Sequence, residues 1–105
     1  MNDRLLSFLG LCRRARKLTI GAQVAVESIE SKKSRLVIYA CDFSKNSLKP
    51  VLEAAEKNGV EALMINRTKD EFSFSLGKLC GVLSVEDSGF AGKLSQMIKD
   101  EQGGE

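Results

Sequence analysis

The segment Arg35-Leu36-Val37-Ile38-Tyr39-Ala40-Cys41 restricts the fold more than any other part of the sequence. An unbroken apolar run of this length is typical of a central strand that is covered on both faces, whereas a half-exposed strand alternates apolar and polar residues. A sheet buried on both faces needs helices on each side. The run therefore predicts an α/β protein, with Tyr39 and Cys41 in its core.

The rest of the chain alternates strand and helix patterns. Short β-type runs are expected at residues 19–20, 60–66 and 82–85. Apolar residues recur at helical spacing over 3–17, 22–31, 46–58, 69–78 and from about 88 to 100. This order predicts a three-layer α/β/α sandwich. The length of 105 residues fits a single domain, 1–100, followed by a frayed tail, 101–105.

Polar residues mark the expected helix ends. The predicted caps are Asp3, Thr68 with Glu71 in a capping box, and Asp87 or Ser88. Asn58-Gly59 is expected to end the helix over 46–58. Pro50 lacks the N–H that an inner helical turn needs, so we expect the regular part of that helix to start late.

The composition argues against an enzyme. The chain has no His, so neither a Ser-His nor a Cys-His nucleophile pair can form. Its three cysteines, Cys12, Cys41 and Cys80, have no metal-ligand or redox spacing, and we expect them to be reduced core residues. We therefore expect no catalytic residue, no metal and no cofactor.

No segment approaches the roughly 18 apolar residues needed to span a bilayer, and the N-terminus lacks the order of a secretory signal. A cytoplasmic, monomeric protein is expected.

Charge is unevenly distributed along the chain. Residues 1–49 hold ten Lys or Arg against four Asp or Glu, and residues 50–105 hold six against ten. Arg13, Arg14, Arg16 and Lys17 form a dense cluster, to which Lys32, Lys33 and Arg35 could add. Such a surface suits the phosphates of a nucleic acid, although solvated helix faces give a similar pattern.

Ligands of open α/β sheets usually meet the loops at one sheet edge, where we expect segments 17–23, 42–47 and 66–70 to converge. Gly21 opens a helix whose first amides suit phosphate, and the Gln23 amide can bond a base edge. Asp42 at a strand end could instead accept a phosphoryl group, as in receiver domains. That chemistry needs further acidic residues beside the first strand, which has none. A turn or helix-cap role is the alternative for Asp42.

At these residues the sequence resembles the ribosomal L-seven-Ae / L-thirty-e family, in its small bacterial YlxQ-like branch. The likeness runs through residues 9–18, Gly21, 33–38, 42–47, Leu76-Gly77 and 86–94. It implies a small mixed sheet and binding to kink-turn RNA, a bent duplex whose tandem G·A pairs lie beside a bulged loop. This would make the chain a non-catalytic, ribosome- or translation-associated protein.

The resemblance also implies the contact residues. Gly21, Ala22, Gln23 and Val24 would read the G·A pairs. Asp42, Phe43 and Ser44, with Leu48 below them, and Lys69 would flank an extruded base. Arg13, Arg16 and Lys17 of the basic cluster would neutralise phosphates.

The chain departs from the family in two places. Strong kink-turn binders have Asn-Glu where this chain has Gln23-Val24, and a Lys or Arg where it has Glu27. The loop after Gly77 is also shorter. These departures motivate an alternative, a protein–protein adaptor that keeps the fold without RNA readout; an exposed apolar patch around residues 79–82 would favour it.

Overall fold

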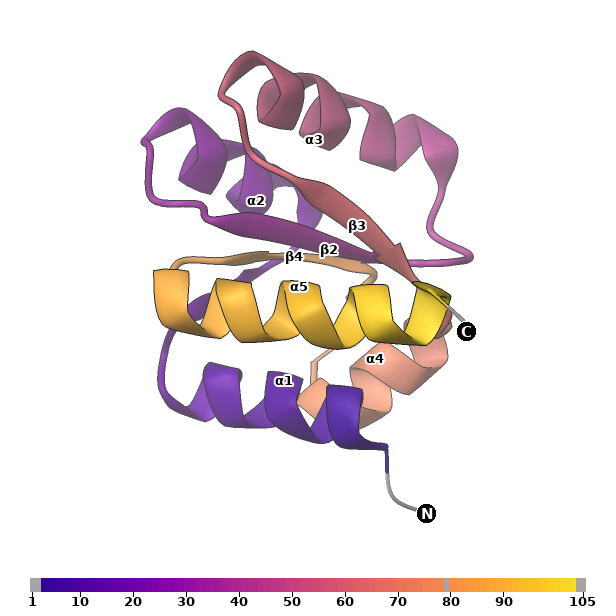
Figure 1. Cartoon of the computed structure of the whole chain (residues 1–105). Coiled ribbons are helices and arrows are strands. Elements are labelled where there is room, and N and C mark those ends of the chain that lie inside the picture. Colours follow the sequence, from indigo (N-terminus) through magenta and orange to yellow (C-terminus); the bar gives the residue numbers. More distant parts are fainter. Residues whose placement is uncertain (1–2, 79, 104–105) are drawn as a thin grey trace.

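The computed structural model describes residues 3–78 and 80–103. Helices and strands alternate along the chain (Figure 1). The helices are α1 (Arg4–Arg14), α2 (Ala22–Glu30), α3 (Lys45–Lys57), α4 (Lys69–Leu76) and α5 (Ser88–Gly103). The strands are β1 (Leu18–Ile20), β2 (Leu36–Ala40), β3 (Ala62–Ile65) and β4 (Val82–Val85).

The strands form one mixed sheet in the order β1-β4-β2-β3. β2 and β3 are parallel, with Ile38 opposite Leu63, whereas β4 is antiparallel to both β1 and β2. The apolar run of residues 35–41 thus contains a central strand, as predicted.

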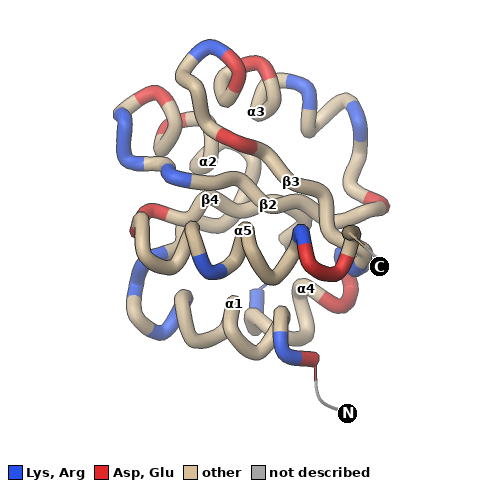
Figure 2. The backbone as a smooth tube through the Cα atoms, in the orientation of Figure 1, with Lys and Arg blue, Asp and Glu red and all other residues tan. Residues whose placement is uncertain are grey.

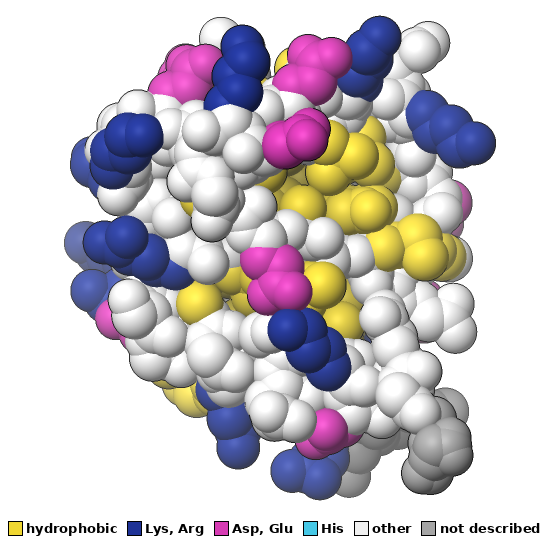
Figure 3. Space-filling view, turned by 45° about the horizontal axis from the view of Figure 1, so that its top comes forward, with side chains coloured by type: hydrophobic (Ala, Val, Ile, Leu, Met, Phe, Trp, Pro, Cys, Tyr) yellow, Lys and Arg dark blue, Asp and Glu magenta, His cyan; other side chains and the backbone are white. Residues whose placement is uncertain are grey.

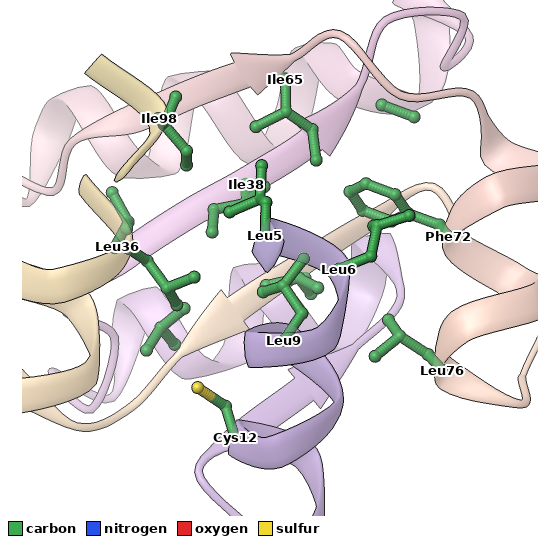
Figure 4. Packing of buried hydrophobic residues seen from close by; sticks show 14 of the residues in the cluster. Leu5, Leu6, Leu9, Cys12, Leu36, Ile38, Ile65, Phe72, Leu76 and Ile98 are labelled. Atoms are coloured by element: carbon green, nitrogen blue, oxygen red, sulfur yellow. The ribbon is translucent and has the colours of Figure 1, made fainter. Parts of the chain in front are cut away.

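Two helical layers cover the sheet, with α2 and α3 on one face and α1, α4 and α5 on the other (Figure 1). This confirms the predicted sandwich. Alternate residues of β2 enter different cores: Leu36 and Ile38 pack with α1, α4 and α5, and Val37 packs with α2 and α3. Figure 4 shows Leu5, Leu9, Phe72 and Ile98 converging on the first of these cores.

The expected caps are present. Asp3 accepts from the Leu6 amide, Asp87 accepts from the Phe90 amide, and Thr68 and Glu71 form the capping box. Asn58 is the C-cap of α3, and Gly59 follows it with a positive φ of 68°. Local hydrogen-bonding chemistry thus sets these boundaries.

Three local expectations were wrong. Pro50 lies inside α3, which already begins at Lys45 because Ser44 caps its first turn. Cys41 is exposed, because it follows the last residue of β2 and leaves the sheet, whereas Cys12 and Cys80 are buried. Tyr39 is only partly buried, since its side of the sheet is open between α3 and β3.

Residues 101–103 of the expected tail continue α5, and residues 104 and 105 lie outside the described residues. Arg67 holds this turn through a 2.8 Å ion pair with Glu101, and it also pairs with Asp3 at 2.7 Å. The Gln102 side chain donates to the Met64 carbonyl at 2.5 Å. Tertiary contacts therefore order a segment whose composition predicts a loose end. Within the described residues, no helix is long and apolar enough to cross a membrane.

Candidate nucleic-acid interface

The start of α2 exposes unpaired backbone amides. Gly21 adopts φ 116° and ψ 152°, a conformation open essentially only to glycine, and its N–H donates to the Val82 carbonyl at 2.9 Å. The first helical bond runs from Ala25 to the Gly21 carbonyl. No side chain caps this end, so among the described residues the amides of Ala22, Gln23 and Val24 have no acceptor. Such a helix start can donate to an anion or to a base edge.

The loop after β2 is fixed to the start of α4. Asp42 Oδ1 accepts from the Lys69 amide at 2.8 Å, and the Cys41 amide donates to the Arg67 carbonyl at 3.0 Å. Asp42 therefore caps a helix, as one alternative predicted, but the capped helix is α4 and not the one that follows it in sequence. Ser44 caps that following helix, α3.

Gly81 joins this loop to β4, and the sequence interpretation missed it. Its carbonyl accepts from the Ala40 amide at 2.8 Å. A Cβ atom at Gly81 would overlap the Phe43 ring at Cδ1 and would lie 3.1 Å from Lys69 Cγ. Phe43 thus packs directly on the glycine backbone. A lone glycine immediately before a strand was the available signal.

These contacts bring three distant segments to one edge of the sheet, where β2 ends and β4 begins. Gly21 is bonded to Val82 at the start of β4, Ala40 is bonded to Gly81 just before β4, and Lys69 is bonded to Asp42. The predicted convergence is therefore correct for the segments containing Gly21–Gln23, Asp42–Ser44 and Lys69.

The convergence was wrong for Lys17, the first residue of segment 17–23. The Lys17 carbonyl accepts from the Glu86 amide at 2.8 Å, at the far end of β4. Leu18 is paired with Val85 and Ile20 with Leu83, so β1 carries the chain across the sheet between Lys17 and Gly21. The sequence could not reveal this, because the two ends of a short strand are close along the chain but lie at opposite edges of the sheet.

Arg13 lies apart from both groups, between α1 and α4. Its guanidinium donates to the Leu76 carbonyl in the last turn of α4, and it lies 3.6 Å from a Cβ position on Gly77. Arg13, Arg14 and Arg16 line one small depression there. Arg13 therefore helps to join two helices.

The receiver-like alternative finds no support around Asp42. Among the described residues, no cluster of three His, Cys, Asp or Glu side chains could hold a metal ion. The nearest partner of the carboxylate is the Lys69 amide.

The adaptor alternative depended on residues 79–82. Leu79 lies outside the described residues, and Cys80, Gly81 and Val82 are buried, so these three form no exposed patch. Cys80 is tied to α4, since its amide donates to Ser73 Oγ at 3.2 Å. Burial raises the pKa of the Cys80 thiol. A highly exposed apolar side chain does occur nearby, Phe74 at 91% exposure, but single exposed apolar residues are common on protein surfaces.

An apolar hollow of about 570 Å³ adjoins the loop after β2, between α3 and β3 (Figure 3). Phe43 and Leu48 line its inner part, Met64 lines the side of β3, and Lys45 lies at the start of α3. The hollow is large enough for a planar ring and is continuous with the Asp42 loop.

The fold and the convergence of these segments define a three-layer α/β protein with a mixed four-stranded sheet. A Giardia lamblia 15.5kD RNA binding protein superposes with a TM-score of 0.72 at 20% identity, over 95% of this chain and 92% of that one. A Bacillus halodurans protein of unknown function superposes with a TM-score of 0.86 at 27% identity, over 93% and 99%.

The sequence comparison identifies the family. The chain is 31% identical to the RNA-binding protein YlxQ of Bacillus subtilis over 91 residues, which are 86% of this chain and 90% of that protein. It is 28% identical to the Enterococcus faecium RNA-binding protein YlxQ over 97 residues, 92% and 93% of the two chains. No family model matches the sequence. The chain belongs to the YlxQ family.

Proposed function

We propose that this protein binds structured RNA of the kink-turn kind, without catalysis, through the edge formed by the start of α2, the loop after β2 and the start of α4. The observation that carries the proposal is the set of unpaired amides at Ala22, Gln23 and Val24, beside the linked Asp42–Lys69 pair. The names of the YlxQ relatives, which are RNA-binding proteins, support the same class of ligand.

In this proposal, each segment at this edge contacts a different part of the RNA. The amides of α2 and the Gln23 side chain contact the G·A pairs, because they present donors that can bond base edges. The Asp42 loop, Phe43, Ser44 and Lys69 flank the extruded base, and the hollow next to Phe43 and Leu48 offers an apolar surface for its ring. Val24, which is 42% exposed, makes an apolar contact where a charged residue would make a polar one.

Docking requires little rearrangement, because the parts are already joined by hydrogen bonds between Gly21 and Val82, Ala40 and Gly81, and Lys69 and Asp42. A preformed surface avoids the entropic cost of ordering loops on binding. We propose that the monomer is the binding form and that it acts on ribosomal or other translation-related RNA.

A gel shift tests the proposal. A labelled kink-turn RNA is compared with the same RNA in which Watson–Crick pairs replace the tandem G·A pairs, at about 0.1 M salt, where non-specific Kd values are about 10⁻⁴–10⁻⁶ M. We expect the kink-turn to bind at least about tenfold more tightly, since one good polar base contact contributes about 1–3 kcal/mol. Equal binding of both RNAs would refute the proposed readout.

A further inference from the structure

The helices α1 and α2 end with the same backbone hydrogen-bond pattern. In α1, the Arg16 amide donates to the Arg13 carbonyl at 2.9 Å and the Lys17 amide to the Cys12 carbonyl at 3.0 Å. In α2, the Lys32 amide donates to the Ile29 carbonyl at 3.1 Å, and the Lys33 amide donates to the Ser28 carbonyl at 3.0 Å. Both patterns are Schellman motifs.

Each motif has a cation where glycine is usual. Arg16 has φ 62° and Lys32 has φ 67°, and they are the two non-glycine residues with positive φ in the described part of the chain. A residue with a side chain disfavours the left-handed conformation relative to the right-handed one. The helix dipole favours nearby cations, but a cation in the preceding turn would satisfy it without strain. The dipole alone therefore does not account for this choice.

The two helix ends lie beside the same end of β4. Glu86, just after β4, donates its amide to the Lys17 carbonyl at 2.8 Å and accepts from Ser28 Oγ at 2.7 Å. The Arg35 amide donates to the Val85 carbonyl at 2.7 Å. This groups five exposed cations around one end of the sheet, which we name the cationic edge: Arg16, Lys17, Lys32, Lys33 and Arg35.

The cations of this edge are available to a ligand. Among the described residues, none of the five has a carboxylate within ion-pair distance, and their one side-chain partner is Asn58, which accepts from Lys32 at 2.5 Å. The nearby Glu86 and Asp87 are already bonded to Ser28 and to the start of α5. With the exposed Glu27 and Glu30 of α2, four carboxylates lie near the five cations, which leaves an excess of one positive charge. Figure 2 shows acidic residues among the basic ones at this end of the sheet.

The cationic edge is opposite to the proposed kink-turn surface. Gly81 belongs to the kink-turn surface and Glu86 to the cationic edge, and the strand between them spans ~16 Å at ~3.3 Å per residue. Figure 3 shows Lys and Arg side chains along the left side of the molecule and others around the apolar hollow, whose lining includes Lys45 and Lys49. The two surfaces therefore lie at opposite ends of the sheet.

We infer that the cationic edge is a second, sequence-independent RNA-binding surface that contacts the phosphate backbone of another RNA segment. The protein would then join two RNA segments, one at each end of its sheet. Exposed cations on the ends of two helices fit the repeated negative charges of a phosphate backbone. The inference depends on the proposed function only for the identity of the first segment.

The test uses a fully Watson–Crick RNA duplex as the probe, binding to the full-length protein. The edge variant combines Lys17→Gln and Lys33→Gln, both outside the strained positions, and the matched control combines Arg4→Gln and Lys99→Gln, which removes the same charge elsewhere. We expect the edge variant to bind the duplex about tenfold more weakly. Its log–log salt slope should fall by about 1.8, because each phosphate that is no longer neutralised lowers the slope by ~0.9. Equal losses in edge and control variants would overturn the inference.

A second measurement separates this inference from the proposed function. Kink-turn RNA fixed to a surface captures the protein, and labelled duplex is then added. A ternary complex is expected for the wild type and the control, and its loss for the edge variant, with kink-turn capture unchanged. Competition between the two RNAs for one site would overturn the second surface. Failure of kink-turn capture, with the duplex result intact, would refute the proposed function alone.

Discussion

The backbone amide of Lys69 donates a 2.8 Å hydrogen bond to Oδ1 of Asp42, 27 residues earlier in the chain. The bond fixes the loop after β2 against the first turn of α4, where unpaired amides and the positive end of the helix dipole favour a carboxylate. Because both residues belong to the proposed RNA surface, the same contact that caps a helix also sets the spacing of two binding segments.

Removing this cap should loosen the RNA surface. We expect Asp42→Ala to destabilise the fold by about 1 kcal/mol, as for other helix caps that are removed, and to weaken kink-turn binding. Asp42→Asn keeps an acceptor oxygen and should retain most of both properties. Hydrogen exchange of the Lys69 amide gives a direct readout: it should accelerate in the alanine variant and stay slow in the asparagine variant. Equal exchange in all three proteins would contradict the proposed coupling.

Gln23 should affect readout without affecting stability. Its side chain is exposed, so Gln23→Ala should change the free energy of unfolding by less than about 0.5 kcal/mol. We expect kink-turn affinity to fall about tenfold, while the RNA with Watson–Crick replacements is unaffected. Gln96→Ala on α5 is the matched control. If both RNAs lost affinity equally with Gln23→Ala, a base-reading role for Gln23 would be excluded.

Gly81 should tolerate no larger residue. The Cβ of Gly81→Ala would overlap the Phe43 ring, so the ring and the Asp42 loop must move. We expect a loss of about 1–3 kcal/mol in stability, as for overpacking, together with weaker RNA binding. Gly92→Ala in α5 is a suitable contrast, because the space around its Cβ is open, and it should stabilise the helix by about 1 kcal/mol. Thermal unfolding of the two variants should therefore shift in opposite directions.

The three cysteines should react in two classes. Cys41 is exposed, whereas Cys12 and Cys80 are buried, and burial raises the pKa of Cys12 to about 11. Because thiolates are the reactive species, brief iodoacetamide treatment at neutral pH should modify Cys41 alone. Mass spectrometry after digestion measures this. Since Cys41 is next to Asp42, bound kink-turn RNA should slow its modification; an unchanged rate in a saturated complex would argue against RNA at this loop.

The Asp3–Arg67–Glu101 cluster should make stability pH-dependent at the acid end. Hydrogen bonding from Arg67 lowers the pKa of Asp3 below its ordinary 3.8. The stabilisation is therefore complete above pH 3.8 and is lost as pH falls through the lower, folded-state pKa. We expect Asp3→Asn to cost about 1 kcal/mol near neutral pH, because both partners are partly exposed. Urea unfolding should show that the difference in stability between the wild type and Asp3→Asn shrinks below pH 3.8. A constant difference at all pH values would contradict a stabilising role of the ionised Asp3 carboxylate.

Sequence patterns predicted most of the local structure for a physical reason. Helix caps such as Asp3, Thr68 and Asp87 act within three residues, so a single short segment contains all the necessary information. The apolar run of residues 35–41 likewise indicated a central strand without reference to its neighbours. The resemblance to the L-seven-Ae / L-thirty-e family identified three segments that the structure brings together.

The sequence alone determined the alternation of elements, the sandwich and the glycine-opened start of α2, because periodicity, turn chemistry and caps are local properties. The tertiary structure decided which residues meet. Strand register put Gly21 at one edge of the sheet and Lys17 at the other, packing placed Gly81 beneath Phe43, and ion pairs with Arg67 extended α5 to Gly103. These features depend on contacts between residues far apart in the chain, whose geometry is fixed only when the sheet has formed.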